Sequence, residues 1–258
     1  MKKTHAAIVA FGIIASSALV VGCTADSGAE PTASNEAPII NGVETTGYPN
    51  VIALYGKKPG EQKGSLCTAE LVAPTVLLTA AHCVSPAVVG DGLVFSALTA
   101  TNLTDQANPS PRVPVSEVHW DSAFNAQQLT NGHDIAVAIL AQPITDVPLL
   151  KISRSTPTNL TKARLVGYGL NNGQQQTGAG IKRTAEVPIG SISETFVTTG
   201  SWGGTTMCNG DSGGPVLATI NGEDVIIGVN SYGFIQCLGT GSSTRVDAYL
   251  DFIDRWVH

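Results

Sequence analysis

Cys208-Asn209-Gly210-Asp211-Ser212-Gly213-Gly214-Pro215-Val216 places one serine inside a glycine-rich turn. A serine hydroxyl is a weak nucleophile until a neighbouring base takes its proton. The oxyanion that forms on attack also needs donors already in place, and the backbone N–H groups of a tight loop supply them. Glycine accepts positive φ and lets the backbone approach a substrate closely. The stretch therefore predicts a nucleophile at Ser212, with a purely structural turn as the alternative.

Two further segments contain the residue types that such a nucleophile needs. Thr79-Ala80-Ala81-His82-Cys83-Val84 offers a histidine, the commonest general base, although a lone histidine is more often a hydrogen-bonded core residue. Asp134 heads an apolar stretch, where an aspartate can equally be a turn residue at the end of a strand. In order and in their wide spacing, the three segments together resemble the active-site signatures of the trypsin/chymotrypsin-like serine proteases.

This resemblance implies a role for each residue. His82 would take the proton from Ser212 and return it to the leaving amine, while Asp134 would orient His82 and stabilise its charged form. Backbone N–H groups of Gly210 and Ser212 would form the oxyanion hole. The implied function is a serine endopeptidase that cleaves proteins or peptides through an acyl-enzyme. A non-catalytic binding module on the same fold is the alternative, and an esterase-like hydrolase is a third reading.

The fold expectation comes from the pattern of apolar residues and from the family. From Ile39 onward, short apolar runs are broken by Gly, Pro and Asn, which is typical of β-sandwiches and barrels. The family has two six-stranded antiparallel β-barrels, so we expect an all-β protease domain of that design over residues 39–258. Between Val246 and Val257 the apolar residues recur at helical spacing and predict one amphipathic α-helix.

Composition excludes several classes of partner. Charged residues form 13% of the chain, about half of the usual share. The net charge of −6 and the lack of a basic stripe argue against nucleic acid. The cysteines lack close C-x-x-C pairs and no acidic cluster suggests calcium, so we expect no metal and no organic cofactor. We expect the protein to be a monomer.

The N-terminus predicts export. Lys2 and Lys3 precede an apolar run that ends near Gly22, the layout of a bacterial-type signal peptide over residues 1–22. A transmembrane helix is the alternative, although the run is short and interrupted by glycine and serine. Val20-Val21-Gly22-Cys23 resembles a lipoprotein signal in which Cys23 is lipidated; cleavage without a lipid is the other reading. Residues 23–38 lack an apolar period and indicate a tether or propeptide.

The cysteine count agrees with an oxidising compartment. Five cysteines leave one without a partner, and Cys23 is the outlier. The resemblance implies two disulfides for the others, Cys67–Cys83 beside His82 and Cys208–Cys237 at the loop that carries Ser212. Free thiols are the alternative. The protein would then be a cell-envelope lipoprotein, a secreted protein, or both in turn.

Ile39-Ile40-Asn41-Gly42 resembles the segment that becomes the new N-terminus of active family members. In those proteins the freed amino group pairs with the aspartate before the nucleophile, here Asp211, although a simple turn role for Asp211 is the alternative. Pro38 departs from the pattern, because a trypsin-like activator would need Arg or Lys there. We therefore expect a zymogen with an unidentified activating protease, and a cut that releases the domain from a lipid on Cys23.

The resemblance also places a substrate pocket. Thr206 falls at the base of the primary specificity pocket, where it supplies no charge for Arg or Lys. Ser231-Tyr232-Gly233 resembles the strand that binds the substrate backbone, and Ser231 would also hydrogen-bond the catalytic aspartate. Gly233 and Gly241 would leave the entrance open. The expected preference is an uncharged residue of medium to large size before the scissile bond, while plain turn chemistry is the alternative for Thr206 and Gly241.

Overall fold

A computed structural model describes residues 39–257 of the chain. The predicted signal peptide, the tether, the lipidation site Cys23 and Pro38 lie outside the described residues. No helix among residues 39–257 is long and apolar enough to cross a membrane.

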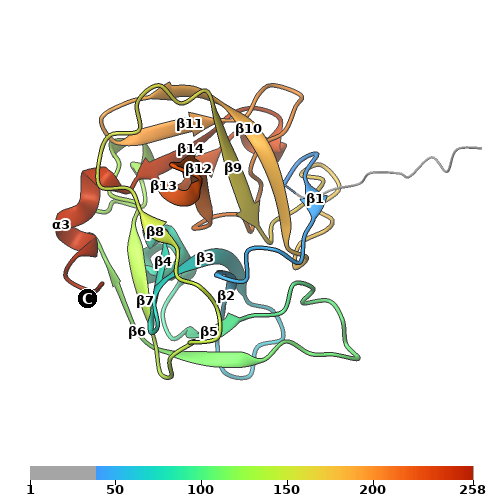
Figure 1. Cartoon of the computed structure of the whole chain (residues 1–258). Helices are drawn as coiled ribbons and strands as arrows, with labels where there is room; N and C mark the ends of the chain where they lie inside the picture. Colours follow the sequence, from blue (N-terminus) through green and yellow to red (C-terminus); the bar gives the residue numbers. More distant parts are fainter. Residues whose placement is uncertain (1–38, 258) are drawn as a thin grey trace, which may run out of the picture. The chain divides into compact units, whose positions relative to one another are not determined.

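The first half of the described chain closes into a six-stranded barrel (Figure 1). Its strands are β2 (Val51–Lys57), β3 (Ser65–Ala73), β4 (Val76–Thr79), β5 (Val94–Leu98), β6 (Arg112–Trp120) and β7 (Ala136–Leu140). They follow one another around the ring as β2-β3-β4-β7-β6-β5, and every pairing is antiparallel. Side chains of valine, leucine and alanine dominate the interior of this barrel, as expected for strands that face a core.

The second half forms another ring of six antiparallel strands. These are β9 (Lys162–Gly167), β10 (Arg183–Ile192), β11 (Phe196–Thr199), β12 (Pro215–Ile220), β13 (Glu223–Gly233) and β14 (Gly241–Arg245). Because β9 pairs with both β10 and β12, the ring closes. Two short strands attach outside it: β1 (Val43–Glu44) on β10, and β8 (Lys151–Ile152) on β13. The expectation of two six-stranded antiparallel barrels is confirmed.

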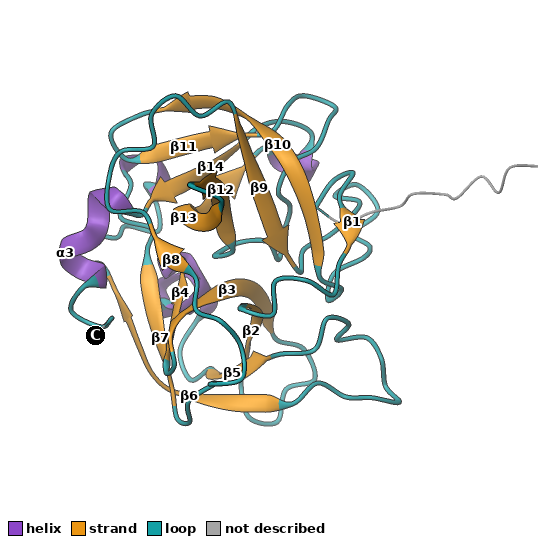
Figure 2. Cartoon of the chain, in the orientation of Figure 1, coloured by secondary structure: helices purple, strands orange, loops and turns teal. Residues whose placement is uncertain are grey.

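Helices are few and short (Figure 2). The α-helices and the 3₁₀ helices (η) of residues 39–257 are α1 (Ala81–Val84), α2 (Pro86–Val89), η1 (Leu129–Asn131), η2 (Ile235–Cys237), η3 (Asp247–Tyr249) and α3 (Leu250–Ile253). The C-terminal helix expected between Val246 and Val257 is confirmed as the short helix α3, which the 3₁₀ turn η3 precedes. Tyr249 has φ of −126°, outside the helical range, and its hydroxyl accepts a hydrogen bond from the backbone N–H of His133. This tertiary contact interrupts a pattern that spacing alone predicts as continuous.

Glu70 on β3 is an unusual core residue. Its side chain is fully buried, and neither carboxyl oxygen has a hydrogen-bond partner among the described residues. Burial raises the pKa of the Glu70 carboxyl well above its usual value of 4.5. A buried polar group without partners is destabilising, so Glu70 opposes folding.

Replacing Glu70 with methionine is expected to stabilise the protein by about 2 kcal/mol at pH 8. Because the pKa of Glu70 is higher in the folded than in the unfolded chain, the stability of the parent falls as pH rises above the unfolded-state pKa. The gap between parent and Glu70→Met should therefore widen from pH 5 to pH 8. Urea unfolding at both pH values measures it, with the exposed Glu194→Met as control. An equal pH dependence in parent and Glu70→Met would contradict this account.

Candidate active site

The structure brings His82 and Asp134 together through neighbouring strands. Thr79 at the end of β4 pairs with Ala136 at the start of β7. The segment after β4, which is α1 with His82, therefore lies beside the segment before β7, which contains Asp134. The Oδ2 atom of Asp134 accepts a hydrogen bond from Nδ1 of His82 at 2.7 Å, and Oδ1 accepts one from the His82 backbone N–H at 2.8 Å. The aspartate thereby fixes both the backbone and the ring of the histidine.

Asp134 is fully buried but well supplied with donors. In addition to the two bonds from His82, the Ser231 hydroxyl donates to Oδ2 of Asp134 at 2.5 Å. Burial by itself would raise the pKa of Asp134, but the hydrogen bonds and charge of His82, together with the Ser231 hydroxyl, bring that pKa below its usual value. The residue is therefore a carboxylate at neutral pH, able to stabilise a protonated His82.

The loop that carries Ser212 is fixed by backbone hydrogen bonds to both barrels. The carbonyl oxygen of Ser212 accepts a bond from Thr68 on β3 at 2.9 Å, and the N–H of Gly213 donates to the carbonyl of Asn230 on β13 at 2.7 Å. Gly213 has φ of +78°, and a Cβ atom there would lie 2.1 Å from Oγ1 of Thr79. Only glycine fits this position, because any side chain would collide with β4.

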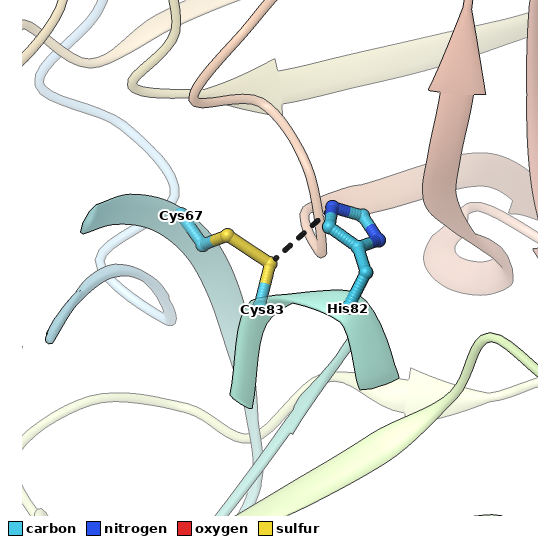
Figure 3. Close-up of side chains that lie close together, drawn as sticks. All are labelled: Cys67, His82 and Cys83. Atoms are coloured by element: carbon cyan, nitrogen blue, oxygen red, sulfur yellow. Dashed lines mark hydrogen bonds between the residues drawn. A yellow bond between two sulfur atoms is a disulfide. The ribbon is translucent and has the colours of Figure 1, made fainter. Parts of the chain in front are cut away.

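Ser212 and His82 line the same cavity of about 490 Å³. No hydrogen bond joins them within residues 39–257. Instead, Nε2 of His82 lies 3.7 Å from the sulfur of Cys83, as Figure 3 shows. The two sulfurs near His82, those of Cys67 and Cys83, form a disulfide, so neither is a thiolate that could bind a metal. These three residues are therefore an imidazole, hydrogen-bonded to Asp134 through Nδ1, beside a disulfide.

Both disulfides implied by the family resemblance are present. Cys67–Cys83 joins the start of β3 to α1, and Cys208–Cys237 joins the Ser212 loop to η2. Each therefore holds one of the segments that carries a proposed catalytic residue.

The segment that begins at Ile39 is bound to the second barrel. The Ile39 side chain is fully buried in the core of that barrel, and the backbone N–H of Ile40 donates to the carbonyl of Thr206 at 3.0 Å. Asp211 is fully buried, and its carboxylate accepts bonds from the backbone N–H groups of Gly169 at 2.8 Å and Cys208 at 2.9 Å. Burial raises the pKa of Asp211 to about 7.

The residues assigned to the substrate pocket come from neighbouring segments. Thr206 is buried, and Gly233 on β13 pairs with Gly241 on β14. Met207 packs against this pair: a Cβ atom on Gly241 would lie 2.5 Å from Cε of Met207. Met207 therefore occupies the space beside Gly241 that a side chain there would fill.

Four residues at the site, one threonine and three lysines, carry no motif that sequence reasoning could use. Thr68 donates from its backbone to Ser212 and from its hydroxyl to the Gly210 carbonyl at 2.8 Å. Its one signal is its place next to Cys67. Three lysines on the wall of the cavity, Lys57, Lys58 and Lys63, also went unassigned.

The sequence of this chain is similar to that of known proteins over most of its length. Residues 39–253 match the family model described as Trypsin. The chain is 26% identical over 240 residues to chymotrypsin-like elastase family member 1 of Bos taurus, covering 82% of this chain and 86% of that protein. It is 27% identical to brachyurin of Leptuca pugilator, with 83% and 96% covered. The identity to chymotrypsin of Phaedon cochleariae is also 27%, with 87% and 84% covered.

Proposed function

This chain belongs to the trypsin family of serine proteases, and on that premise we propose that it is a serine endopeptidase with Ser212, His82 and Asp134 as its catalytic triad. The proposal rests on the buried Asp134 carboxylate, which accepts a hydrogen bond from Nδ1 of His82. The same histidine lines a cavity together with Ser212. The alternative of a binding module accounts less well for a charged carboxylate kept in the interior beside that cavity.

The proposed reaction follows from the hydrogen bonding of the two ring nitrogens of His82. With the Nδ1 proton of His82 donated to Asp134, Nε2 is left as the basic atom that takes the Ser212 proton. The Ser212 oxygen then attacks the substrate carbonyl, and His82 returns the proton to the departing amine. Water repeats the sequence on the acyl-enzyme and regenerates Ser212.

Two backbone donors are available for the oxyanion. Among the hydrogen bonds of residues 39–257, the N–H groups of Gly210 and Ser212 donate to no other protein atom. Gly210 has φ of +97°, which lets these two amides sit in one tight turn. We assign them to the oxyanion hole, where one donor contributes roughly 3 kcal/mol to the transition state.

The substrate preference we propose is for an uncharged residue before the scissile bond. Thr206 at the pocket base offers a hydroxyl and no charge, and the apolar Met207 bounds the glycine pair Gly233 and Gly241. Residues 231–233 would pair with the substrate backbone as an added strand.

We also propose that the protein is exported with its domain beginning at Ile39. A signal over residues 1–22, a tether over 23–38 and a lipid on Cys23 would make the intact chain an anchored zymogen. Cleavage after Pro38 by another protease would release the enzyme, since both disulfides join residues downstream of the cut. Ile39 and Asp211 are both buried. This burial supports a pairing of the Asp211 carboxylate with the new amino group of Ile39. N-terminal analysis of the active fraction tests this, and active enzyme with an uncut Pro38–Ile39 bond and a lipid would reject it.

Digestion of an unfolded protein tests the endopeptidase assignment. The processed enzyme should create new internal termini, mainly after uncharged residues, which terminal sequencing by mass spectrometry identifies. Turnover of small esters without any peptide cleavage would favour an esterase. No turnover of either substrate by the processed enzyme would favour the binding module.

A further inference from the structure

The cavity that holds His82 and Ser212 has a positively charged wall. Lys57, at the end of β2, and Lys58 and Lys63, on the connection to β3, all line it. Lys57 and Lys58 are half-buried, whereas Lys63 is exposed. This concentration of positive charge is notable in a chain whose net charge is −6.

These three lysines differ from the other lysines that the structure describes. Lys151 and Lys162 form salt bridges with Glu223 and Glu186, and the buried Lys182 donates to the Tyr48 carbonyl. Within residues 39–257, by contrast, none of the three cavity lysines forms a salt bridge. Their charges are thus left available to a ligand in the cavity.

One acidic residue, Glu61, lines the cavity with them. It offsets one of the three positive charges, so the lining residues keep a positive balance. A negatively charged ligand segment would gain Coulomb energy there, more beside the half-buried Lys57 and Lys58 than beside a fully solvated charge.

The position of the cavity determines which half of a substrate enters it. The strand assigned to the substrate backbone before the scissile bond, residues 231–233, does not line this cavity, and neither does Thr206. The cavity extends from Ser212 and His82 to Cys67 of the Cys67–Cys83 disulfide and to α2, and most of its lining belongs to the first barrel. It is therefore the place for the part of the substrate that leaves first.

We propose that Lys57, Lys58 and Lys63 select substrates that carry aspartate or glutamate within the few residues after the scissile bond. The inference rests on the proposed endopeptidase function and adds a preference on the leaving side, which the pocket around Thr206 does not determine. Complementary charge at a binding surface favours encounter with the matching partner and disfavours a partner of like charge.

Three peptides test the proposal. They are identical up to the scissile bond and carry two alanines, two glutamates or two lysines at the second and third positions after it. At low ionic strength, kcat/KM of the processed enzyme should be about tenfold higher for the glutamate than for the alanine peptide, and lower still for the lysine peptide. The preference should shrink in 0.5 M salt, because screening weakens interactions between exposed charges.

Variants identify the residues responsible. The triple variant Lys57→Gln, Lys58→Gln, Lys63→Gln should lose the glutamate preference, so that its kcat/KM values for the glutamate and alanine peptides become similar. Glu61→Gln should enlarge the preference, and Lys162→Gln, on the outside of the second barrel, should leave it unchanged.

The failures are distinguishable. If none of the three peptides is cleaved, the endopeptidase assignment falls and this inference falls with it. If all three are cleaved at similar rates, or if the triple variant keeps the preference, the inference is overturned while the endopeptidase assignment stands.

Discussion

Replacement of Ser212 by alanine is expected to lower kcat/KM for peptide cleavage by about 10⁴- to 10⁶-fold. The Ser212 loop is held in place by backbone hydrogen bonds to Thr68 and Asn230. Those bonds use backbone atoms, so alanine preserves them and the melting temperature should stay close to that of the parent. The loss would therefore report the missing nucleophile and not an unfolded protein.

A double variant sharpens this result. Residues that act as one unit give non-additive losses, so Ser212→Ala combined with His82→Ala should be about as inactive as Ser212→Ala alone. Ser191→Ala, at an exposed serine on β10, is the matched control and should keep full activity. Retention of parental kcat/KM by Ser212→Ala would remove Ser212 from the mechanism.

Asp134→Asn is expected to lower kcat/KM by about 10⁴-fold, the size typical of this triad. The carboxylate accepts three hydrogen bonds, from the His82 ring, the His82 backbone and Ser231. An amide has only one acceptor oxygen, and its NH₂ group would turn His82 to the tautomer that leaves Nε2 without a lone pair. Steady-state kinetics at neutral pH measures the loss.

The difference in stability between the parent and Asp134→Asn should depend on pH. The pKa of Asp134 in the folded chain lies below its usual value, so its carboxylate contributes stability above the unfolded-state pKa, and this contribution is lost as pH falls. Parent and Asp134→Asn should therefore differ in melting temperature at pH 7 and approach each other in acid. An unchanged difference at low pH would contradict the direction assigned to this pKa.

The chain offers a matched control for this pair. His133 binds Asp121 through Nδ1 at 3.0 Å, a second histidine–aspartate pair that lines no part of the cavity. Asp121→Asn should leave kcat/KM within about twofold of the parent, since surface pairs contribute little. A loss in Asp121→Asn equal to that in Asp134→Asn would point to a general structural effect.

Sequence reasoning was most successful where chemistry is local. The turn around Ser212 needs glycines because of its own backbone angles, and alternation of short apolar runs with turn residues reflects strands that close into barrels. The contact between His82 and Asp134 is not local, and it was predicted only because the whole set resembles a known family.

The features that sequence reasoning missed depend on the approach of distant segments. The burial of Glu70 without a partner follows from the closure of the first barrel, and the contact of Met207 with Gly241 follows from the way the loops of the second barrel meet. The C-terminal helix is short because Tyr249 is held by His133. No periodicity in the chain reports such contacts.

The most direct test of the account is to treat the naturally exported protein with a fluorophosphonate and to measure its intact mass. The account predicts one covalent adduct per molecule, on a species that begins at Ile39, and no adduct in Ser212→Ala. A folded species that begins at Ile39 and remains unlabelled would contradict the central claim that Ser212 is an activated nucleophile.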